Sequence, residues 1–274
     1  MSPLAHWRTG IVESGGEDIY YEVVERDAPQ ATVVLTHGAG GSHAVWYQQV
    51  VALADDYRVV TWDARGFGKS TYRTGTHGAT ASAQDLGAVL DATGTPDAHL
   101  VGQSMGGWWI TTFALAWPDR VRSLTLCNTI GGCWNDGLDA HFASYVATAR
   151  ADAAEAEVAG RHPAVGGTET GDDVAKAFLY QQLNTFHSPP MGDVFPALVT
   201  TRHSHDAIRA LPFPKLVITS TDDPIFPAAH VRESADGIGA DIVEIEGAGH
   251  SPYWERPDDF NKQLLAFLSR AEER

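Results

Sequence analysis

Short apolar runs alternate with longer amphipathic stretches along most of the chain. The apolar runs are rich in β-branched residues, which is typical of strands buried on both faces of a sheet. The predicted strands of this kind are residues 31–36, 57–62, 98–103, 121–127, 215–220 and 240–245. The turn-rich residues 14–18 separate two further strand candidates, 11–13 and 19–24, and together they predict an opening hairpin.

Between these runs, apolar residues recur at the spacing of one helix face. The helices predicted in this way are residues 42–54, 79–93, 105–117 and 257–271. Because strands and helices alternate, we expect an α/β fold with a mostly parallel, eight-stranded sheet and helices on both faces.

The alternation stops between residues 128 and 211, where the chain is rich in alanine and helical in pattern. No linker divides the rest of the chain into two halves. We therefore expect one core, formed by residues 1–127 and 212–274, with residues 128–211 inserted as a helical cap. Such a cap would cover the C-terminal edge of the sheet and shape a substrate pocket.

One strand runs directly into the sequence Gly102-Gln103-Ser104-Met105-Gly106. This G-x-S-x-G pattern between a strand and a helix is typical of a nucleophile elbow, in which a sharp turn exposes the serine. Side chains at 102 or 106 would collide across that turn. Ser104 is the predicted nucleophile, and the Met105 N–H at the helix N-terminus is the first predicted donor to an oxyanion.

Two other strands end in glycine-rich loops. His37-Gly38-Ala39-Gly40-Gly41 lets the backbone approach a bound group, so the Ala39 N–H is the second predicted oxyanion donor. The other loop, residues 63–70, contains Asp63 and Arg65, which we expect to hold the loop together rather than to do chemistry.

An acid and a base follow in the order typical of serine hydrolases. Asp222 and Asp223 both lie just past the strand at 215–220, and either could orient a histidine. His250 stands between a glycine and a proline-containing turn after the last strand, where it could act as the base.

Composition limits the classes of partner. The formal net charge of −16 argues against nucleic acid and anionic membranes as partners. The N-terminal residues lack a secretion signal and no apolar run reaches 18 residues, so a cytoplasmic location is expected. Cys127 and Cys133 are expected to be small buried residues, and His203 with His205 lacks the further ligands of a metal site. No metal ion or organic cofactor is expected, and a homodimer is left open.

These motifs together resemble the α/β-hydrolase superfamily over nearly the full chain. The matching segments are residues 37–40, 63–70, 102–107, 223–227 and 249–251. In that family the acid usually lies four residues before the proline that stands here at 227, and this selects Asp223. The elbow and residues 118–121 and 124–129 look most like the branch of enol-lactonases and small carboxylesterases.

The resemblance implies hydrolysis of a small-molecule ester or lactone through an acyl-enzyme on Ser104. His250 would act as base and Asp223 as orienting acid. Candidate substrate contacts are Gly38, Gln103, Trp108 and Trp134. Two alternatives remain, a C–C bond hydrolase of the meta-cleavage type and a non-catalytic ligand receptor on the same fold. Haloalkane dehalogenases and epoxide hydrolases carry an aspartate where this chain has Ser104, so those activities are not expected.

Overall fold

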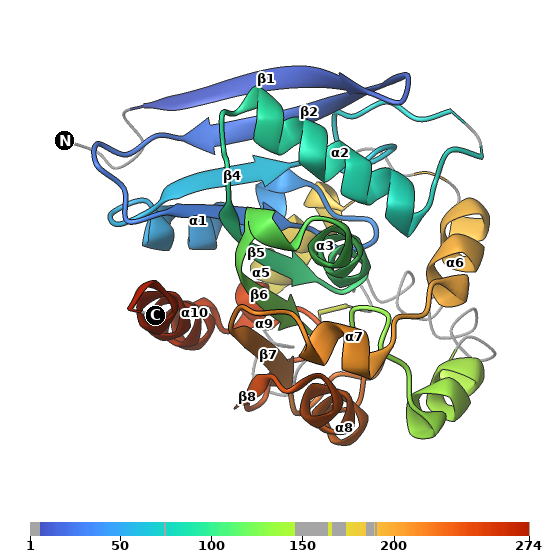
Figure 1. Cartoon of the computed structure of the whole chain (residues 1–274). Helices are drawn as coiled ribbons and strands as arrows, with labels where there is room; N and C mark the ends of the chain where they lie inside the picture. The colour runs from blue at the N-terminus through green and yellow to red at the C-terminus, as the bar shows by residue number, and fades with distance from the viewer. Residues whose placement is uncertain are drawn as a thin grey trace.

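A single eight-stranded sheet forms the centre of the molecule in this computed structural model (Figure 1). The strands are β1 (Trp7–Ser14), β2 (Glu17–Val24), β3 (Thr32–Thr36), β4 (Arg58–Trp62), β5 (Ala98–Gln103), β6 (Val121–Cys127), β7 (Lys215–Ser220) and β8 (Asp241–Ile245). Their order across the sheet is β1-β2-β4-β3-β5-β6-β7-β8. β2 pairs antiparallel with both β1 and β4, and the pairings from β4 through to β8 are parallel.

The structure describes residues 6–73, 75–145, 164–165, 174–184, 189 and 191–273. The named helices are η1 (His43–Trp46), α1 (Tyr47–Leu53), α2 (Ala79–Ala92), α3 (Met105–Ala116), η2 (Pro118–Arg120), α5 (Val174–Leu183), α6 (Met191–Thr200), α7 (His205–Arg209), α8 (Ala228–Ile238), α9 (Pro252–Glu255) and α10 (Pro257–Glu272). Residues 136–145 are also helical. Of the helices in these ranges, none has the length and hydropathy needed to cross a bilayer.

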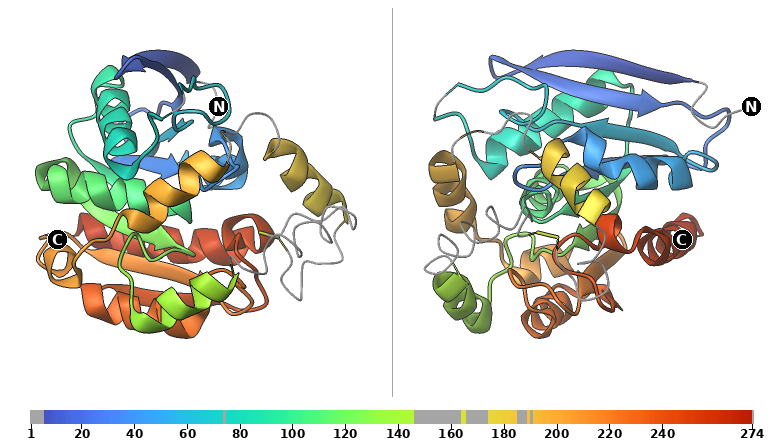
Figure 2. Two further views of the ribbon diagram at one scale, coloured as in Figure 1. Left: turned by 90° about the vertical axis from the view of Figure 1, so that its right-hand side faces the viewer. Right: turned by 180° about the vertical axis from the view of Figure 1, so that it is seen from behind.

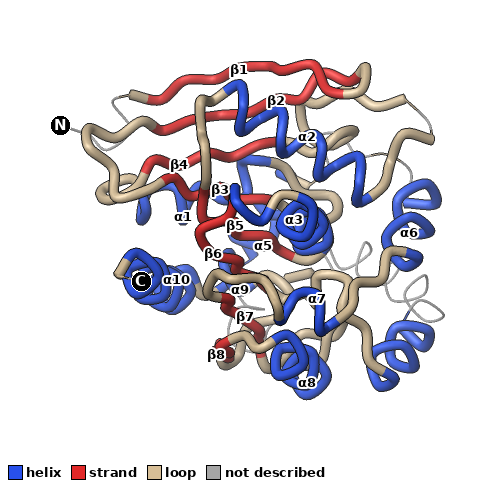
Figure 3. The backbone as a smooth tube through the Cα atoms, in the orientation of Figure 1, coloured by secondary structure: helices blue, strands red, loops and turns tan. Residues whose placement is uncertain are grey.

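Helices cover both faces of the sheet, which appears as a layer of red strands between blue helices in Figure 3. On one face, α2, α3 and α8 pack on a core that includes Val34 and Leu100. On the other face, α1 and α10 pack on a core that includes Val33 and Val101. Successive strand residues therefore alternate between two buried cores, which explains why the parallel strands are apolar along their whole length.

The predicted fold class is confirmed, with local differences. The expected helix at 42–54 begins as the 3₁₀ turn η1 and becomes α-helical only at Tyr47. Helices α8 and α9 were not predicted. The helices at 136–145, α5, α6 and α7 lie between β6 and β7, inside the expected cap segment. The division into core and cap at residues 127 and 212 stays a prediction.

The parallel register brings the predicted site loops to one edge of the sheet. Thr36 lies opposite Gly102, Gln103 opposite Cys127, and Cys127 opposite Ile218. Ser220 in turn lies opposite Ile245. The segments that follow these strand ends carry the glycine-rich loop, Ser104, Asp223 and His250, so residues more than 200 positions apart in sequence converge at the carboxyl ends of the strands.

Candidate active site

Ser104 occupies the sharp turn between β5 and α3. Its φ of 49° and ψ of −121° lie in a backbone region that non-glycine residues rarely adopt. The turn is held on both sides, because the Ser104 N–H donates to the Cys127 carbonyl at 3.0 Å and its own carbonyl accepts from the Gly107 N–H at 2.9 Å. A strained residue fixed in this way at a sheet edge is the geometry of a nucleophile elbow.

The glycines beside Ser104 are required by close backbone approaches. A Cβ on Gly102 would lie 2.8 Å from the carbonyl oxygen of Gly106. A Cβ on Gly106 would lie 2.5 Å from the carbonyl oxygen of His37 and 2.6 Å from that of Thr36. The predicted collision across the turn is found for Gly102, and Gly106 in addition packs directly against the end of β3.

The glycine-rich loop after β3 lies against the elbow. A Cβ on Gly38 would approach the Ser104 Cβ to 3.0 Å, so the loop backbone runs beside the serine. His37 stabilises the loop, since its Nδ1 lies 2.7 Å from the Gly38 carbonyl oxygen and its Nε2 accepts from the Ala64 N–H. Burial lowers the pKa of His37, so its ring stays neutral and this bonding pattern persists.

The two predicted oxyanion donors lie on either side of Ser104 in this arrangement. Ala39 follows Gly38 in the loop, and Met105 begins α3. Within the described residues, neither N–H donates to a backbone carbonyl outside helices and strands. A role of these two groups in stabilising an oxyanion stays a prediction.

Asp223 and His250 form a hydrogen-bonded pair at the ends of β7 and β8. His250 Nδ1 lies 2.9 Å from Asp223 Oδ2, and the exposed fractions of the two side chains are 4% and 0%. The second carboxylate oxygen accepts the backbone N–H groups of Ile225 and Phe226. Asp222 instead bonds locally to Thr221. The structure thus resolves the choice that the sequence left between two adjacent aspartates.

Asn128, immediately after β6, is a site residue that sequence reasoning missed. Its Nδ2 donates to Asp223 Oδ2 at 2.8 Å and to Ser220 Oγ at 2.5 Å, and it lies 3.4 Å from the Gly249 carbonyl oxygen. Its φ of 45° is one that asparagine tolerates better than most residues. The only signal in the sequence was an asparagine placed directly after a predicted strand. Its amide group bonds to the acid and lies beside the histidine loop.

A second missed residue, Glu255, holds the histidine loop from the other side. It is 3% exposed, and its Oε1 accepts the N–H groups of Gly249 and Ser251, the two neighbours of His250. Gln103 adds a third support, because its Nε2 donates to the His250 carbonyl at 3.1 Å. The predicted substrate contact at Gln103 is untested, but its amide group already bridges the nucleophile strand to the base.

The structure describes no hydrogen bond between the Ser104 hydroxyl and His250. With Nδ1 held by Asp223, Nε2 is the nitrogen of His250 that remains for such a bond. Hydrogen bonds between a nucleophile and its base are often long without substrate and tighten when it binds. The described geometry therefore shows the strained turn at Ser104 and the Asp223–His250 hydrogen bond, while their roles in a catalytic triad stay a prediction.

Trp108 and Trp134, two predicted substrate contacts, belong to an aromatic cluster that reaches His250. Trp108 is buried, and its ring lies 6.1 Å from Trp134 and 5.9 Å from Phe226. The Phe226 ring in turn lies 5.8 Å from the His250 ring. Trp108 Nε1 donates to the Thr201 carbonyl beyond α6. The cluster forms an apolar wall beside the base, although contact with substrate is untested.

The elbow is closely covered on the side of α6. A cavity of about 10 Å³ lies between the Met105 end of the elbow and Val194, Ala197 and Leu198 of α6, with His77 and Trp109 on its walls. This volume is about that of one water molecule. The space between Met105 and α6 is therefore too small for more than about one water molecule.

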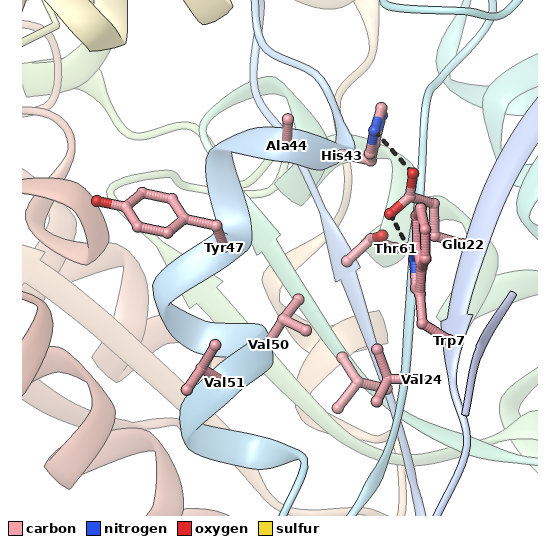
Figure 4. Close-up of a pocket in the computed structure, with 10 residues that line it drawn as sticks. Trp7, Glu22, Val24, His43, Ala44, Tyr47, Val50, Val51 and Thr61 are labelled. Carbon is pink, nitrogen blue, oxygen red and sulfur yellow. Dashed lines mark hydrogen bonds and ion pairs between the residues drawn. The ribbon is translucent and has the colours of Figure 1, made fainter. Parts of the chain in front are cut away.

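A larger cavity of about 450 Å³ lies between α1 and the β2–β4 part of the sheet, away from the predicted site residues (Figure 4). At its polar end, His43 Nε2 lies 3.1 Å from Glu22, and His43 Nδ1 lies 2.8 Å from Asp63. Burial opposes charge on the ring, but these hydrogen bonds outweigh it and raise the pKa of His43 to about 9. Burial likewise opposes the Glu22 charge, but His43 and other donors lower the pKa of Glu22 to about 2.

This ion-pair network fixes the far end of the glycine-rich loop. Asp63 accepts from the His43 and Lys69 N–H groups, and Arg65 pairs with the buried Asp85 at 2.6 Å. Both side chains therefore hold their loop together, as the sequence predicts.

The two cysteines and His203 lie in surroundings that do not favour chemistry. Cys127 and Cys133 are free and buried, and burial raises the pKa of both thiols, that of Cys133 to about 12. His203 Nε2 lies 2.9 Å from Thr112 Oγ1. In the part of the chain that the structure describes, no three His, Cys, Asp or Glu side chains are grouped to hold a metal ion.

Known proteins resemble this chain over almost its full length. It is 30% identical to "Putative carbamate hydrolase RutD" of Azorhizobium caulinodans, covering 99% of this chain and 100% of the relative. It is 27% identical to 3-oxoadipate enol-lactonase 1 of Acinetobacter baylyi, covering 86% and 88% of the two chains. The crystal structure of the esterase RhEst1 from a Rhodococcus species matches with a TM-score of 0.78 at 29% identity, covering 96% and 98%.

These relatives confirm the resemblance to enol-lactonases and esterases that the motifs indicate. Residues 31–257 match the family described as the alpha/beta hydrolase fold. That range extends from β3 to the segment after α9 and contains the elbow, the glycine-rich loop and the acid–base pair. The chain is therefore a member of the α/β-hydrolase family.

Proposed function

We propose that this protein hydrolyses a small-molecule carboxylic ester or lactone through an acyl-enzyme on Ser104. The buried Asp223–His250 hydrogen bond carries the proposal. It fixes one ring nitrogen of a histidine on the edge where a strained serine stands, which is the arrangement that serine hydrolysis needs.

In the first half-reaction, His250 Nε2 takes the Ser104 hydroxyl proton as the serine oxygen attacks the substrate carbonyl carbon. Asp223 orients the imidazole and stabilises the imidazolium that forms. The Ala39 and Met105 N–H groups stabilise the oxyanion, each contributing about 3 kcal/mol. The tetrahedral intermediate expels the alcohol group, which receives the proton from His250, and leaves the acyl group on Ser104.

In the second half-reaction, His250 takes a proton from water as the water oxygen attacks the acyl carbon. As the new tetrahedral intermediate collapses, its bond to the Ser104 oxygen breaks, His250 gives the proton to that oxygen, and the carboxylic acid is released. For a lactone the alcohol and the acid belong to the same molecule. Each step is a proton transfer coupled to formation or cleavage of a C–O bond, so this chemistry proceeds with the chain's own residues and water.

The comparison with the RutD relative adds carbamates as a second candidate substrate class. A carbamate presents a similar carbonyl to the serine and forms a tetrahedral intermediate of the same charge. The aromatic wall of Trp108, Trp134 and Phe226 favours substrates with an apolar group in either class.

Intact-protein mass spectrometry after treatment with a small fluorophosphonate tests the proposal. We expect one adduct on the parent and none on Ser104→Ala, with labelling of His250→Ala slowed by at least about 100-fold. Ser42→Ala is a matched control, because the Ser42 hydroxyl is buried near the same loop and bonds to no described group. An unlabelled parent, or an adduct that survives in Ser104→Ala, contradicts the proposal.

Turnover of p-nitrophenyl acetate, dihydrocoumarin and a p-nitrophenyl carbamate then separates the substrate classes. A labelled parent that turns over none of these substrates contradicts ester and lactone hydrolysis. Hydrolysis of a vinylogous diketone would then favour the C–C hydrolase, and binding without turnover would favour the receptor.

A further inference from the structure

Helix α5 (Val174–Leu183) presents one face to the candidate catalytic loops. Lys176, Tyr180 and Asn184 are spaced four residues apart, so their side chains lie on the same side of the helix and of its C-terminal extension. Figure 2 shows α5, in yellow in the right-hand view, between the blue η1–α1 segment and the red α9. All three residues contact one or the other of these neighbours or the loops beside them.

The middle of α5 bonds to the loop that carries His250. Tyr180 is 3% exposed, and its hydroxyl lies 2.8 Å from Ser251 Oγ, on the residue that follows the base. Lys176 Nζ donates to the Glu255 carbonyl at 2.9 Å, and Trp254 Nε1 donates to the Lys176 carbonyl at 3.3 Å. The Tyr180 hydroxyl also lies 3.4 Å from that of Tyr253, so four hydrogen bonds tie about one turn and a half of α5 to residues 251–255.

The end of α5 lies against the glycine-rich loop. The Asn184 side chain is turned back onto the helix, because its Nδ2 donates to the Tyr180 carbonyl at 2.7 Å. A Cβ on Gly40 would lie 3.8 Å from both the carbonyl oxygen and Oδ1 of Asn184. The same helix face thus lies near the predicted oxyanion loop at one end and bonds to the base loop in its middle.

The base loop is held from two sides. Glu255 binds the N–H groups on either side of His250, as described above, and Tyr180 binds the Ser251 side chain from α5. Burial raises the pKa of Tyr180, so its hydroxyl remains protonated near neutral pH and able to donate. Small displacements of a catalytic group lower the reaction rate by large factors. A hydrogen bond to the residue next to the base can therefore change the rate by changing the position of the base.

We propose that Tyr180 is a positioning residue, which couples the placement of helix α5 to the orientation of His250 through the Tyr180–Ser251 hydrogen bond. The inference rests on the proposed function, since it assigns Tyr180 a role in the Ser104–His250 reaction. It implies that the contact of α5 with Ser251 helps to keep the base aligned.

Tyr180→Phe removes the hydroxyl and keeps the ring that packs edge-on against Trp254, with centroids 5.1 Å apart. Tyr47→Phe is the matched control, because the Tyr47 ring packs on the same Trp254 at 5.4 Å but its hydroxyl makes no described hydrogen bond. We expect Tyr180→Phe to lower both kcat and the limiting rate of Ser104 phosphonylation about 3- to 10-fold. KM should change less than about 2-fold, and Tyr47→Phe should match the parent.

If Tyr180 only held the expected cap segment in place, its loss should affect KM and not kcat. In that case KM rises while kcat and the limiting phosphonylation rate equal those of the parent, and this result overturns the proposal. Ser251→Ala provides an independent variant that removes the other hydroxyl. Tyr180→Phe also removes a longer contact of 3.4 Å with the Tyr253 hydroxyl, so the two single variants share the Tyr180–Ser251 bond but are not identical. We expect Ser251→Ala to lower kcat and the phosphonylation rate as well, and the double variant to lose less than the product of the two single losses. Losses that multiply in the double variant also overturn the proposal.

The outcomes separate this inference from the proposed function. A parent protein that fluorophosphonate does not label overturns both. A parent that labels on Ser104, with a Tyr180→Phe variant that labels at the same rate, overturns the role of Tyr180 alone.

Discussion

The nucleophile elbow and the acid–base pair lie at the same edge of the sheet, but different forces hold them. The elbow is fixed by main-chain contacts between segments that touch because glycines leave no side chain between them. The acid–base pair is fixed by side-chain hydrogen bonds that converge from Asn128, Gln103 and Glu255. A closely packed backbone contact tolerates almost no added atom. A hydrogen-bond network that loses one member keeps its other bonds, so its function declines gradually.

This difference predicts that substitutions at the elbow lower the stability of the fold. Substitutions around the acid–base pair should instead lower the catalytic rate. A glycine replaced at the elbow forces two backbones apart. An amide removed beside Asp223 leaves the fold intact and the carboxylate less firmly placed. Four variants test this difference.

Gly106→Ala should be the most damaging, because its Cβ would meet two carbonyl oxygens at 2.5 and 2.6 Å. We expect a loss of about 3 kcal/mol or more in the free energy of unfolding. Gly87→Ala in α2 is the control, since its Cβ would meet only ordinary contacts at 3.6 Å and should stabilise the helix by about 0.5–1 kcal/mol. Urea unfolding measures both, and a fully stable Gly106→Ala variant would refute steric control of the elbow.

His43→Gln tests whether charge also holds the glycine-rich loop. The pKa of His43 is raised from about 6.5 when unfolded to about 9 when folded, so its contribution is complete below pH 6.5. That contribution is lost as the pH rises through 9, and the shift corresponds to about 3 kcal/mol. The stability difference between the parent and His43→Gln should therefore shrink between pH 6.5 and 9. A difference that is constant over this range would exclude a charged His43.

Asn128→Gly removes the amide beside Asp223 and keeps a residue that tolerates the positive φ. Hydrogen bonds to charged groups contribute about 1.5–3 kcal/mol, so kcat/KM for an ester should fall about 10- to 100-fold. Asn135→Gly is the control, because its amide donates to His230 and Ser234 instead. Steady-state kinetics decide the question, and equal losses in the two variants would mean that Asn128 acts only on stability.

Leu198→Ala should have the smallest effect of the four variants, and we expect it to change substrate specificity. Leu198 lines the cavity of about 10 Å³ beside Met105, so its removal makes room for a larger substrate group. We expect the ratio of kcat/KM for p-nitrophenyl hexanoate over acetate to rise about 5-fold. Thr200→Ala, at an exposed position of the same helix, should leave the ratio unchanged. A ratio unaffected by Leu198→Ala would place the acyl group elsewhere.

Much of the fold and part of the candidate site are readable from the sequence because they depend on local pattern. β-Branched runs identify the strands, and the elbow is visible because its glycines and serine are consecutive. Asp223, by contrast, stands beside an equally suitable aspartate, and residue type alone does not separate them. The family resemblance selected Asp223, and the contact with His250 gives the physical reason.

The class of fold and the tight serine turn could be predicted from the amino-acid sequence, and so could the net charge, from which we expect no nucleic-acid partner. These follow from periodicity, from glycine geometry and from composition, which are properties of neighbouring residues or of the whole chain. The tertiary structure alone decided that Asn128, Glu255 and Tyr180 surround the acid and the base. Each of those contacts depends on how loops and helices pack at the sheet edge. The pattern of neighbouring residues in the sequence does not predict that packing.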